Sequence, residues 1–324
     1  MLEEIQKHNW KPFPHKRKTH FFSTVGSKGP CASFHNQCSW CIGLRWSNKG
    51  SLCFGDPTIL PQTIFIASFH FKFFYKNIYP YIPSDHKYII IIADEDATIP
   101  TQLDCRYPRD RIFNINEWQH ILDNKNILHI FASHLDIPAT DRFSPIPVGF
   151  NPEECPSNNI DSIMNIHIDL DIMNRPLKVL HTCRIREGNQ WNQRKQVKYL
   201  VEGPWNKFSE YKSIPKENYF KEIQKYSFIL CVHGGGLEPN PKVFTALYCG
   251  TIPIVKRFVN CDILYKDLPV VFVDDWEPNS ITLPLLNKWR EELISYFIYP
   301  KRELAIEKLT TQYWIDKIEA YFLR

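Results

Sequence analysis

A glycine triplet followed by a lysine is the feature of this sequence best suited to bind a charged ligand. The glycines at 234–236 directly follow an apolar run at 228–232, and Lys242 opens a second apolar run that stops at Gly250. Glycines let a backbone approach a ligand closely, and the start of a helix attracts anions. A lysine in a first helical turn opposes the helix dipole unless an anion lies beside it. The pattern predicts a diphosphate-binding loop, with Asn240 as the N-cap of the helix.

Basic residues after a predicted strand at 177–181 are candidates for the same ligand. Arg184 follows this strand, and Arg194 and Lys195 lie in a predicted helix at 191–201. Residues that follow a strand of a parallel sheet are expected at its carboxyl edge, where α/β proteins bind ligands. A solvent-exposed helix face is an equally good interpretation for Arg194 and Lys195.

Three acidic residues follow a near-continuous apolar run at 87–93, namely Asp94, Glu95 and Asp96. A carboxylate or histidine at a strand end can act as a general base, and we favour Asp96 with His70 as the second candidate. Asp96 is also a residue type that caps helices. Asp94-x-Asp96 has the oxygen ligands that bind Mn²⁺ or Mg²⁺, so a metal site is a competing hypothesis.

Cysteines concentrate in the first 60 residues, where a CxxC pair, Cys38 and Cys41, is flanked by Cys31 and Cys53. Together with His35 they are the right types for a tetrahedral zinc site. No second CxxC pair exists in the sequence, and buried free thiols are therefore the favoured interpretation. A zinc-stapled binding module remains the hypothesis from a different functional class.

Length and composition favour a folded protein of two domains. The chain has 324 residues, of which 44% are hydrophobic and 23% charged, with a formal net charge of +4. This charge does not favour nucleic acid as a partner. No apolar run reaches the ~18–20 residues of a membrane span, and the acidic start Met1-Leu2-Glu3-Glu4 lacks the apolar core of a signal peptide. We expect a cytoplasmic protein with reduced cysteines.

Alternating strand and helix patterns predict an α/β protein with two Rossmann-like domains. An irregular segment at 1–60 is expected to pack on a first domain at 61–165, and 151–176 is polar and loop-like. The second domain spans 176–300, and 301–324 forms a C-terminal helix. Expected strands are 63–67, 87–93, 111–115, 127–131, 177–181, 228–232, 252–255 and 270–273. Expected helices are 72–78, 116–122, 191–201, 220–226, 242–249 and, broken at Pro300, 285–322.

The stretch 227–255 resembles the donor-binding region of exostosin-like glycosyltransferases. It shares the order glycine loop, acidic residue, basic residue, Ala246-Leu247, Gly250 and Ile252-Pro253-Ile254-Val255. Other segments match in the same order over roughly 63–320, including Phe73-Phe74, Tyr88 to Asp96, Pro145 to Gly149, Arg194-Lys195, Asp275-Trp276 and Tyr313-Trp314. The resemblance implies a GT-B fold, with a cleft between two Rossmann-like domains and a C-terminal helix that crosses back to the first.

The resemblance also implies an activity, namely inverting, metal-independent transfer of a sugar to a hydroxyl of a glycan. The expected donor is a UDP-sugar such as UDP-xylose, the acceptor is an oligosaccharide or glycoprotein, and no cofactor is expected. The family's usual Glu is Thr245 here, and Glu238 stands at the family's Asp position. The expected donor-binding residues are Arg184, Arg194, Lys195, His233, Gly234, Gly235, Gly236, Glu238, Asn240, Lys242 and Thr245, and the expected catalytic residues are Asp96, His70 and Asp94.

A metal-dependent GT-A-like transferase that uses Asp94 and Asp96 is the alternative within the same class of enzyme. A GT-A enzyme would not need a second Rossmann-like half with its own glycine loop, and this favours the GT-B interpretation.

Overall fold

The chain folds into two compact units in the computed structural model, which describes residues 2–13, 18–25, 34–43, 52–103, 111–185, 188, 191–239 and 241–323. Unit 1 comprises Met1–Val148 and Thr311–Arg324, and unit 2 comprises Gly149–Thr310. The polar stretch 151–176 belongs to unit 2, where it contains the short 3-10 helices Pro152–Glu154, Pro156–Asn158 and Ile160–Asn165.

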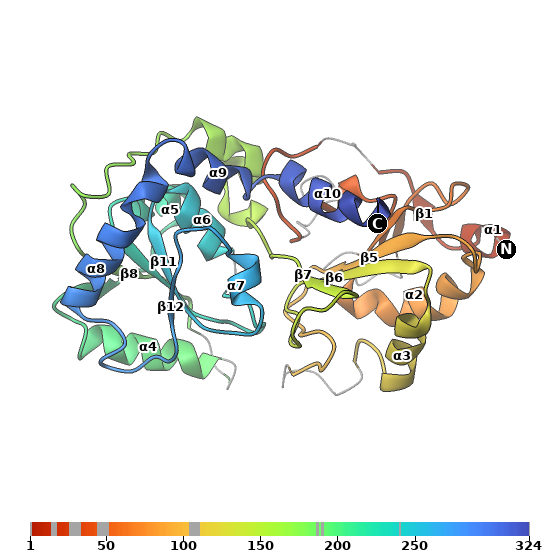
Figure 1. The fold of residues 1–324 in the computed structure, drawn as a ribbon, viewed down its shortest axis with the longest axis horizontal. Coiled ribbons are helices and arrows are strands. Elements are labelled where there is room, and N and C mark those ends of the chain that lie inside the picture. Colours follow the sequence, from red (N-terminus) through yellow and green to blue (C-terminus); the bar gives the residue numbers. More distant parts are fainter. Residues whose placement is uncertain are drawn as a thin grey trace. The chain divides into compact units, whose positions relative to one another are not determined.

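Unit 1 is built on a sheet with the strand order β1-β3-β2-β4-β5-β6-β7 among the described residues (Figure 1). Neighbouring strands are parallel except for the antiparallel pair β2 and β3. Every residue of β5 is buried, as its continuous apolar sequence requires when both faces of a sheet are covered. The strands are β1 (Trp10–Lys11), β2 (Trp40–Ile42), β3 (Cys53–Gly55), β4 (Thr63–Ala67), β5 (Tyr88–Ala93), β6 (Ile127–Ala132) and β7 (Phe143–Pro145).

Two expectations for unit 1 are wrong. The segment 1–60, expected to be irregular, supplies β1, β2 and β3 to the sheet, and these strands of two or three residues are too short to show a period. The expected strand at 111–115 is instead the approach to a helix. There the side chain of Asn114 accepts a bond from the Glu117 backbone N–H, and the Glu117 side chain accepts one from the Asn114 backbone N–H. This capping box starts α3 (Ile115–Asp123).

Helices α2 (Phe71–Asn77) and α3 follow β4 and β5 and lie together on one side of the unit 1 sheet, while α10 (Thr311–Glu319) lies on the other (Figure 1). A short helix, α1 (Leu2–Gln6), precedes β1. The ring of Trp314 packs 5.4 Å from that of Phe22, and Tyr321 stacks 3.8 Å from His129 of β6. The end of the chain therefore rejoins unit 1, as predicted.

Unit 2 has a sheet in which all neighbouring strands are parallel, with the order β12-β11-β10-β8-β9 among the described residues. The strands are β8 (Val179–His181), β9 (Ser209–Tyr211), β10 (Phe228–Cys231), β11 (Ile252–Lys256) and β12 (Val271–Val273). The chain first proceeds from β8 to β9 and then crosses back to β10 on the opposite side of β8. This is a doubly wound order with a reversal between β8 and β10.

Helix α4 lies on one side of the unit 2 sheet, and α5 and α6 lie on the other (Figure 1). The helices of the unit are α4 (Asn192–Glu202), α5 (Tyr219–Ile223), α6 (Lys242–Tyr248), α7 (Cys261–Leu264), α8 (Leu283–Leu293) and α9 (Lys301–Glu307). The α/β class and the two Rossmann-like units are therefore confirmed. Among the described residues, no helix combines the length and the apolar character that a bilayer crossing requires.

The carboxyl end of α6 is held by two arginines. Arg175 donates to the carbonyls of Cys249 (3.0 Å) and Gly250 (2.8 Å), and Arg302 donates to those of Leu247 and Tyr248, both at 2.7 Å. Cations suit the negative end of a helix dipole, and the last carbonyls of a helix lack the i+4 N–H partners of its interior. Gly250 has φ +67°, the left-handed conformation predicted for the residue that stops this helix. The two arginines thus hold the carboxyl end of α6 in place.

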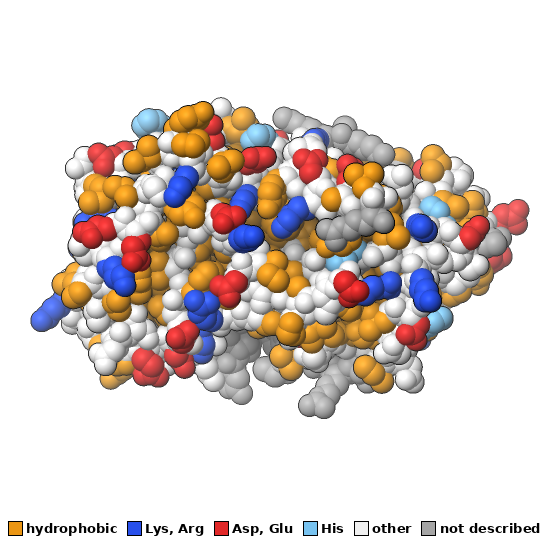
Figure 2. Space-filling view, in the orientation of Figure 1, with side chains coloured by type: hydrophobic (Ala, Val, Ile, Leu, Met, Phe, Trp, Pro, Cys, Tyr) orange, Lys and Arg blue, Asp and Glu red, His pale blue; other side chains and the backbone are white. Residues whose placement is uncertain are grey.

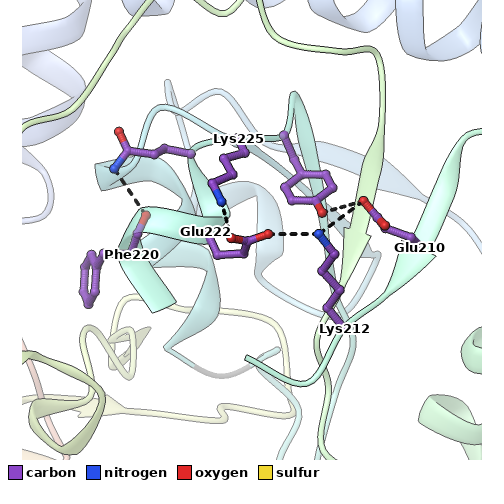
Figure 3. A network of polar contacts seen from close by, with 7 residues as sticks. Glu210, Lys212, Phe220, Glu222 and Lys225 are labelled. Atoms are coloured by element: carbon purple, nitrogen blue, oxygen red, sulfur yellow. Dashed lines mark hydrogen bonds and ion pairs between the residues drawn. The ribbon is translucent and has the colours of Figure 1, made fainter. Parts of the chain in front are cut away.

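Charged side chains of both signs are interspersed over the face drawn in Figure 2. One close network joins the end of β9 to α5 and the turn after it (Figure 3). There Glu222 accepts bonds from Lys212 (2.9 Å) and Lys225 (2.6 Å), and Lys212 also lies 3.7 Å from Glu210. Hydrogen bonds from Lys225 and Lys212 lower the pKa of Glu222. The network fastens α5 to an edge strand of the sheet.

Candidate functional site

The strand reversal between β8 and β10 defines the candidate ligand site of unit 2. In doubly wound sheets the loops after the two strands at such a reversal diverge and leave a crevice at the carboxyl edge. The loop after β8 carries Cys183 and Arg184, and the loop after β10 carries the glycines at 234–236. The glycines are partly exposed and Arg184 is exposed. The sequence-predicted glycine loop and Arg184 thus emerge from neighbouring strands.

Lys242 is the first residue of α6 and is partly buried. Its ammonium lies 3.1 Å from the sulfur of Cys183. The carboxyl group of Glu154 lies within electrostatic reach of Lys242 and of Arg184. Burial raises the pKa of Glu154, and Lys242 opposes that rise. Lys242 therefore joins α6 to the loop after β8 and faces the polar groups at that strand end.

Arg194 connects the loops on either side of the reversal. Its Nε donates to the carbonyl of His233 (3.0 Å), and Nη1 donates to the carbonyl of Arg184 (2.9 Å). The guanidinium also stacks on Trp191, 4.5 Å from the ring centre. The sequence left open whether Arg194 and Lys195 contact a ligand or lie on a solvent-exposed helix face. Lys195 is exposed, whereas Arg194 is buried and does not lie on the exposed face. Arg194 is a positioning residue for both loops.

His233 precedes the glycines and is buried. One ring nitrogen lies 3.3 Å from the carbonyl of Lys256, and the ring packs edge-on against Phe258. Burial lowers the pKa of His233 to about 4. The imidazole is therefore neutral at physiological pH and anchors the start of the glycine loop to β11.

Glu238 and Thr245 both have buried side chains. Glu238 accepts a hydrogen bond from Tyr265 of the residues after α7 (3.0 Å), and the Thr245 hydroxyl donates to the carbonyl of Pro241 (3.4 Å). Both side chains therefore form hydrogen bonds with other groups of unit 2. Asn240 lies outside the described residues, and the described N-cap of α6 is Pro241.

The carboxyl edge of the unit 1 sheet carries the predicted acids. Asp94 is buried with φ +74°, and His134, two residues after β6, is buried with φ +54°. Each lies two residues beyond a pair of facing residues, Ile92 of β5 and Ala132 of β6. Left-handed backbone at a residue other than glycine is uncommon, and it is concentrated at functional sites. Two such residues at neighbouring strand ends identify this edge as a second candidate site.

His70 and Asp96 flank this edge. His70 ends the short 3-10 helix after β4, and a Cβ on Gly43, with φ +76°, would come within 2.2 Å of its ring. Gly43 is therefore required for the histidine to lie where it does. Asp96 is partly exposed, and no helix follows it in the described residues 97–103, so it is not an N-cap within this range.

Several residues of the two edges were missed from the sequence. Cys183 and Glu154 were not distinguished from other buried residues, because nothing local shows their proximity to Lys242. His134 and Gly43 each follow a strand within two residues, as Asp94 does, and that position was the available signal.

Cys38, Cys41 and Cys53 are buried free thiols. Burial raises the pKa of Cys38 and of Cys53 to about 12, and it raises that of Cys41 as well. Cys31 lies outside the described residues. Within the described part of the chain, no group of three or more His, Cys, Asp or Glu side chains is arranged to hold a metal ion.

Comparison with known proteins yields structural likeness only. No family model and no curated protein matches the chain. A solved structure of trehalose-6-phosphate from E. coli bound with UDP-2-fluoro glucose matches with a TM-score of 0.42 and 9% identity, over 79% of this chain and 72% of that one. Sucrose-phosphate synthase from Thermosynechococcus elongatus matches with a TM-score of 0.39 and 12% identity, over 81% of this chain and 71% of that one. TarM matches with a TM-score of 0.42 and 9% identity, over 80% of this chain and 54% of that one. Scores and identities this low assign the chain to no family.

Proposed function

We propose that the protein is a glycosyltransferase that binds a nucleotide-sugar at the carboxyl edge of the unit 2 sheet. The observation that supports the proposal is the strand reversal between β8 and β10, where Arg184 and the glycines at 234–236 follow neighbouring strands and Lys242 contacts Cys183 beside Arg184. A doubly wound sheet binds its ligand at such a point. Two cations beside a glycine loop suit a diphosphate, because the loop brings backbone N–H groups close and the cations offset the charge.

The same cations supply a chemical role. When the bond between a sugar and a diphosphate breaks, negative charge develops on the leaving diphosphate, and positioned cations stabilise that charge. We assign this role to Lys242 and Arg184, with Arg194 holding the loops in place. The resemblance to exostosin-like glycosyltransferases supports a UDP-sugar donor, such as UDP-xylose, and an oligosaccharide or glycoprotein acceptor.

The base that activates the acceptor hydroxyl is proposed among the residues of the unit 1 edge. Asp96 is the first candidate, since it is partly exposed and follows the buried strand β5, and His70 and Asp94 are the others. An inverting, metal-independent transfer needs one such base and cationic stabilisation of the leaving group. The metal-dependent alternative, with Mn²⁺ or Mg²⁺ at Asp94 and Asp96, makes a different prediction about chelators.

A thermal-shift screen tests the proposal. The full chain is heated with a panel of UDP-sugars and GDP-sugars, each with and without EDTA, and with single-stranded nucleic acid as the binding-module arm. A ligand that binds the folded state raises the melting temperature. We expect UDP-sugars to raise it equally with and without EDTA. Loss of the shift in EDTA would support the metal-dependent alternative, and a shift with nucleic acid and with none of the sugars would contradict a transferase.

A further inference from the structure

Cys183, which contacts Lys242, lies inside the proposed donor site and has no part in the function proposed so far. The sulfur and the ammonium nitrogen are 3.1 Å apart, and Cys183 is 1% exposed. A thiol is a weak hydrogen-bond partner, whereas a thiolate beside a cation forms an ion pair. The short distance and the burial are therefore consistent with a thiolate at Cys183 that is paired with the Lys242 ammonium.

The surroundings of Cys183 are unusually cationic for a buried thiol. Lys242 of α6, Arg194 of α4 and His181 of β8 act on it. The other titratable groups described at this strand end include Cys231 of β10, Tyr219 of α5, Glu154 and Arg184. Burial by itself would raise the pKa of Cys183, but Lys242, then His181 and Arg194, bring it well below the ordinary thiol value. In contrast, burial raises the pKa of Cys231 on the neighbouring strand.

The burial of His181 shows where its imidazole can find a partner at this strand end. It is 0% exposed, and within the described residues neither ring nitrogen makes a hydrogen bond of normal geometry. A buried polar ring without such a partner is costly. Its position beside Cys183 therefore points to an interaction with the sulfur rather than with the rest of the fold.

We propose that Lys242 holds Cys183 as a thiolate in the free protein, and that a nucleotide diphosphate takes Lys242 from the sulfur while Cys183 takes up one proton from solvent. The inference rests on the proposed function. Without the lysine, and beside the negative diphosphate, a buried thiolate has lost its main counter-charge, and burial then favours the neutral thiol. Cys183 is thus a positioning residue that keeps Lys242 directed at the site and makes donor binding depend on pH.

The free protein tests the first half of this inference. The ultraviolet absorbance of thiolates is followed against pH in the wild type, Cys183→Ser and Lys242→Met, with Cys231→Ser as the control for a buried cysteine on the neighbouring strand. We expect one thiolate that persists below the ordinary thiol range, is absent from Cys183→Ser, is shifted to higher pH in Lys242→Met and is unchanged in Cys231→Ser. Superimposable curves for Cys183→Ser and the wild type would overturn the proposal.

Calorimetry tests the second half. UDP-glucose and UDP-xylose are suitable probes, because their phosphates do not titrate near neutral pH. Titrations in buffers of different ionisation enthalpy should show uptake of about one proton by the wild type and none by Cys183→Ser. Because binding takes up a proton, the affinity of the wild type should fall by up to about tenfold for each unit by which the pH is raised, over the range in which Cys183 is a thiolate in the free protein and a thiol in the complex. Equal uptake by both proteins would assign the proton to a group other than Cys183 and overturn the inference.

The two failures are distinguishable. If neither UDP-sugar binds the wild type, the donor proposal fails and the proton exchange fails with it, while the absorbance titration still decides whether Cys183 is ionised. If a UDP-sugar binds without proton uptake, the donor proposal stands and only the inference is contradicted.

Discussion

The carboxyl edges of the two sheets differ although both units are α/β layers. In unit 2 the chain reverses between β8 and β10, whereas in unit 1 the strands β4, β5, β6 and β7 follow one another in a single direction. The unit 2 edge gathers cations and glycines. The unit 1 edge carries acids and histidines, two of them, Asp94 and His134, in left-handed backbone.

The difference shows two ways of building a site on the same layers. In unit 2 the candidate site is indicated by topology, because a strand reversal is where doubly wound sheets bind their ligands. Unit 1 has no such reversal between β4 and β7, and its edge is marked instead by backbone that is stable only when the surrounding structure enforces it. The expected division of labour is donor binding in unit 2 and acid–base chemistry in unit 1, and each prediction below separates these roles.

Unit 1 should lose turnover without losing donor affinity when its base is removed. We expect Asp96→Asn to lower the rate of UDP release from a bound UDP-sugar by roughly 10²–10⁴-fold, because a general base contributes about that factor. Donor affinity should stay at the wild-type value. The control is Asp123→Asn, at the exposed end of α3. Unchanged turnover in Asp96→Asn would pass the role to His70 or Asp94.

Unit 2 should show the opposite behaviour. Lys242→Met is expected to weaken the binding of a UDP-sugar by roughly 10–100-fold, because a charge-assisted hydrogen bond contributes about 1.5–3 kcal/mol. The measurement is calorimetric affinity. Lys288→Met, which removes an exposed lysine of α8 in the same unit, is the matched control. An affinity that is equal in both variants would remove Lys242 from the donor site.

His233 should make the stability of unit 2 sensitive to acid. Its pKa is about 4 in the folded protein and about 6.5 in an unfolded chain. Between these values the unfolded state binds more protons, so stability falls as pH falls from 6.5 towards 4. From urea unfolding at pH 6.5 and 4.5, we expect the wild type to lose on the order of 2 kcal/mol more than His233→Gln. Equal losses would mean that folding does not lower the pKa of His233.

The network of Figure 3 should matter least, because its labelled residues belong to β9, α5 and the segments beside them, and none of these is a proposed donor residue. Glu222→Gln is expected to lower the free energy of unfolding by less than about 1 kcal/mol, as is usual for partly exposed ion pairs. The lowered pKa of Glu222 means that this contribution is present above the unfolded pKa and is lost as pH falls through the folded one. A change in donor affinity would contradict the placement of the site.

Much of the architecture was predictable from the sequence because long apolar runs with clear boundaries repeat along it. The run at 87–93 and the sequence from Phe228 to Val255 gave strands and a helix close to those found. The strands β1, β2 and β3 were not predictable, since two or three residues show no period. The expected strand at 111–115 failed because the capping signal of Asn114 and Glu117 was not used.

The candidate sites were only partly predictable. Lys242 and the glycines could be proposed from the sequence because loop and helix signals are local. Cys183 lies 59 residues from Lys242 in the sequence, and the contact exists only because β8 and β10 pair. Asp94 and His134 are likewise distinguished by their left-handed backbone conformation, which residue types alone do not specify.

A crystal structure of the full chain with UDP tests the central claim most directly. We expect the diphosphate at the carboxyl edge of unit 2 between the loops after β8 and β10, with its oxygens within hydrogen-bond distance of the Lys242 ammonium and of backbone N–H groups at 234–236. Lys242 should then no longer contact Cys183. A diphosphate bound at the acids of unit 1, or one that leaves the contact between Lys242 and Cys183 intact, would contradict the account.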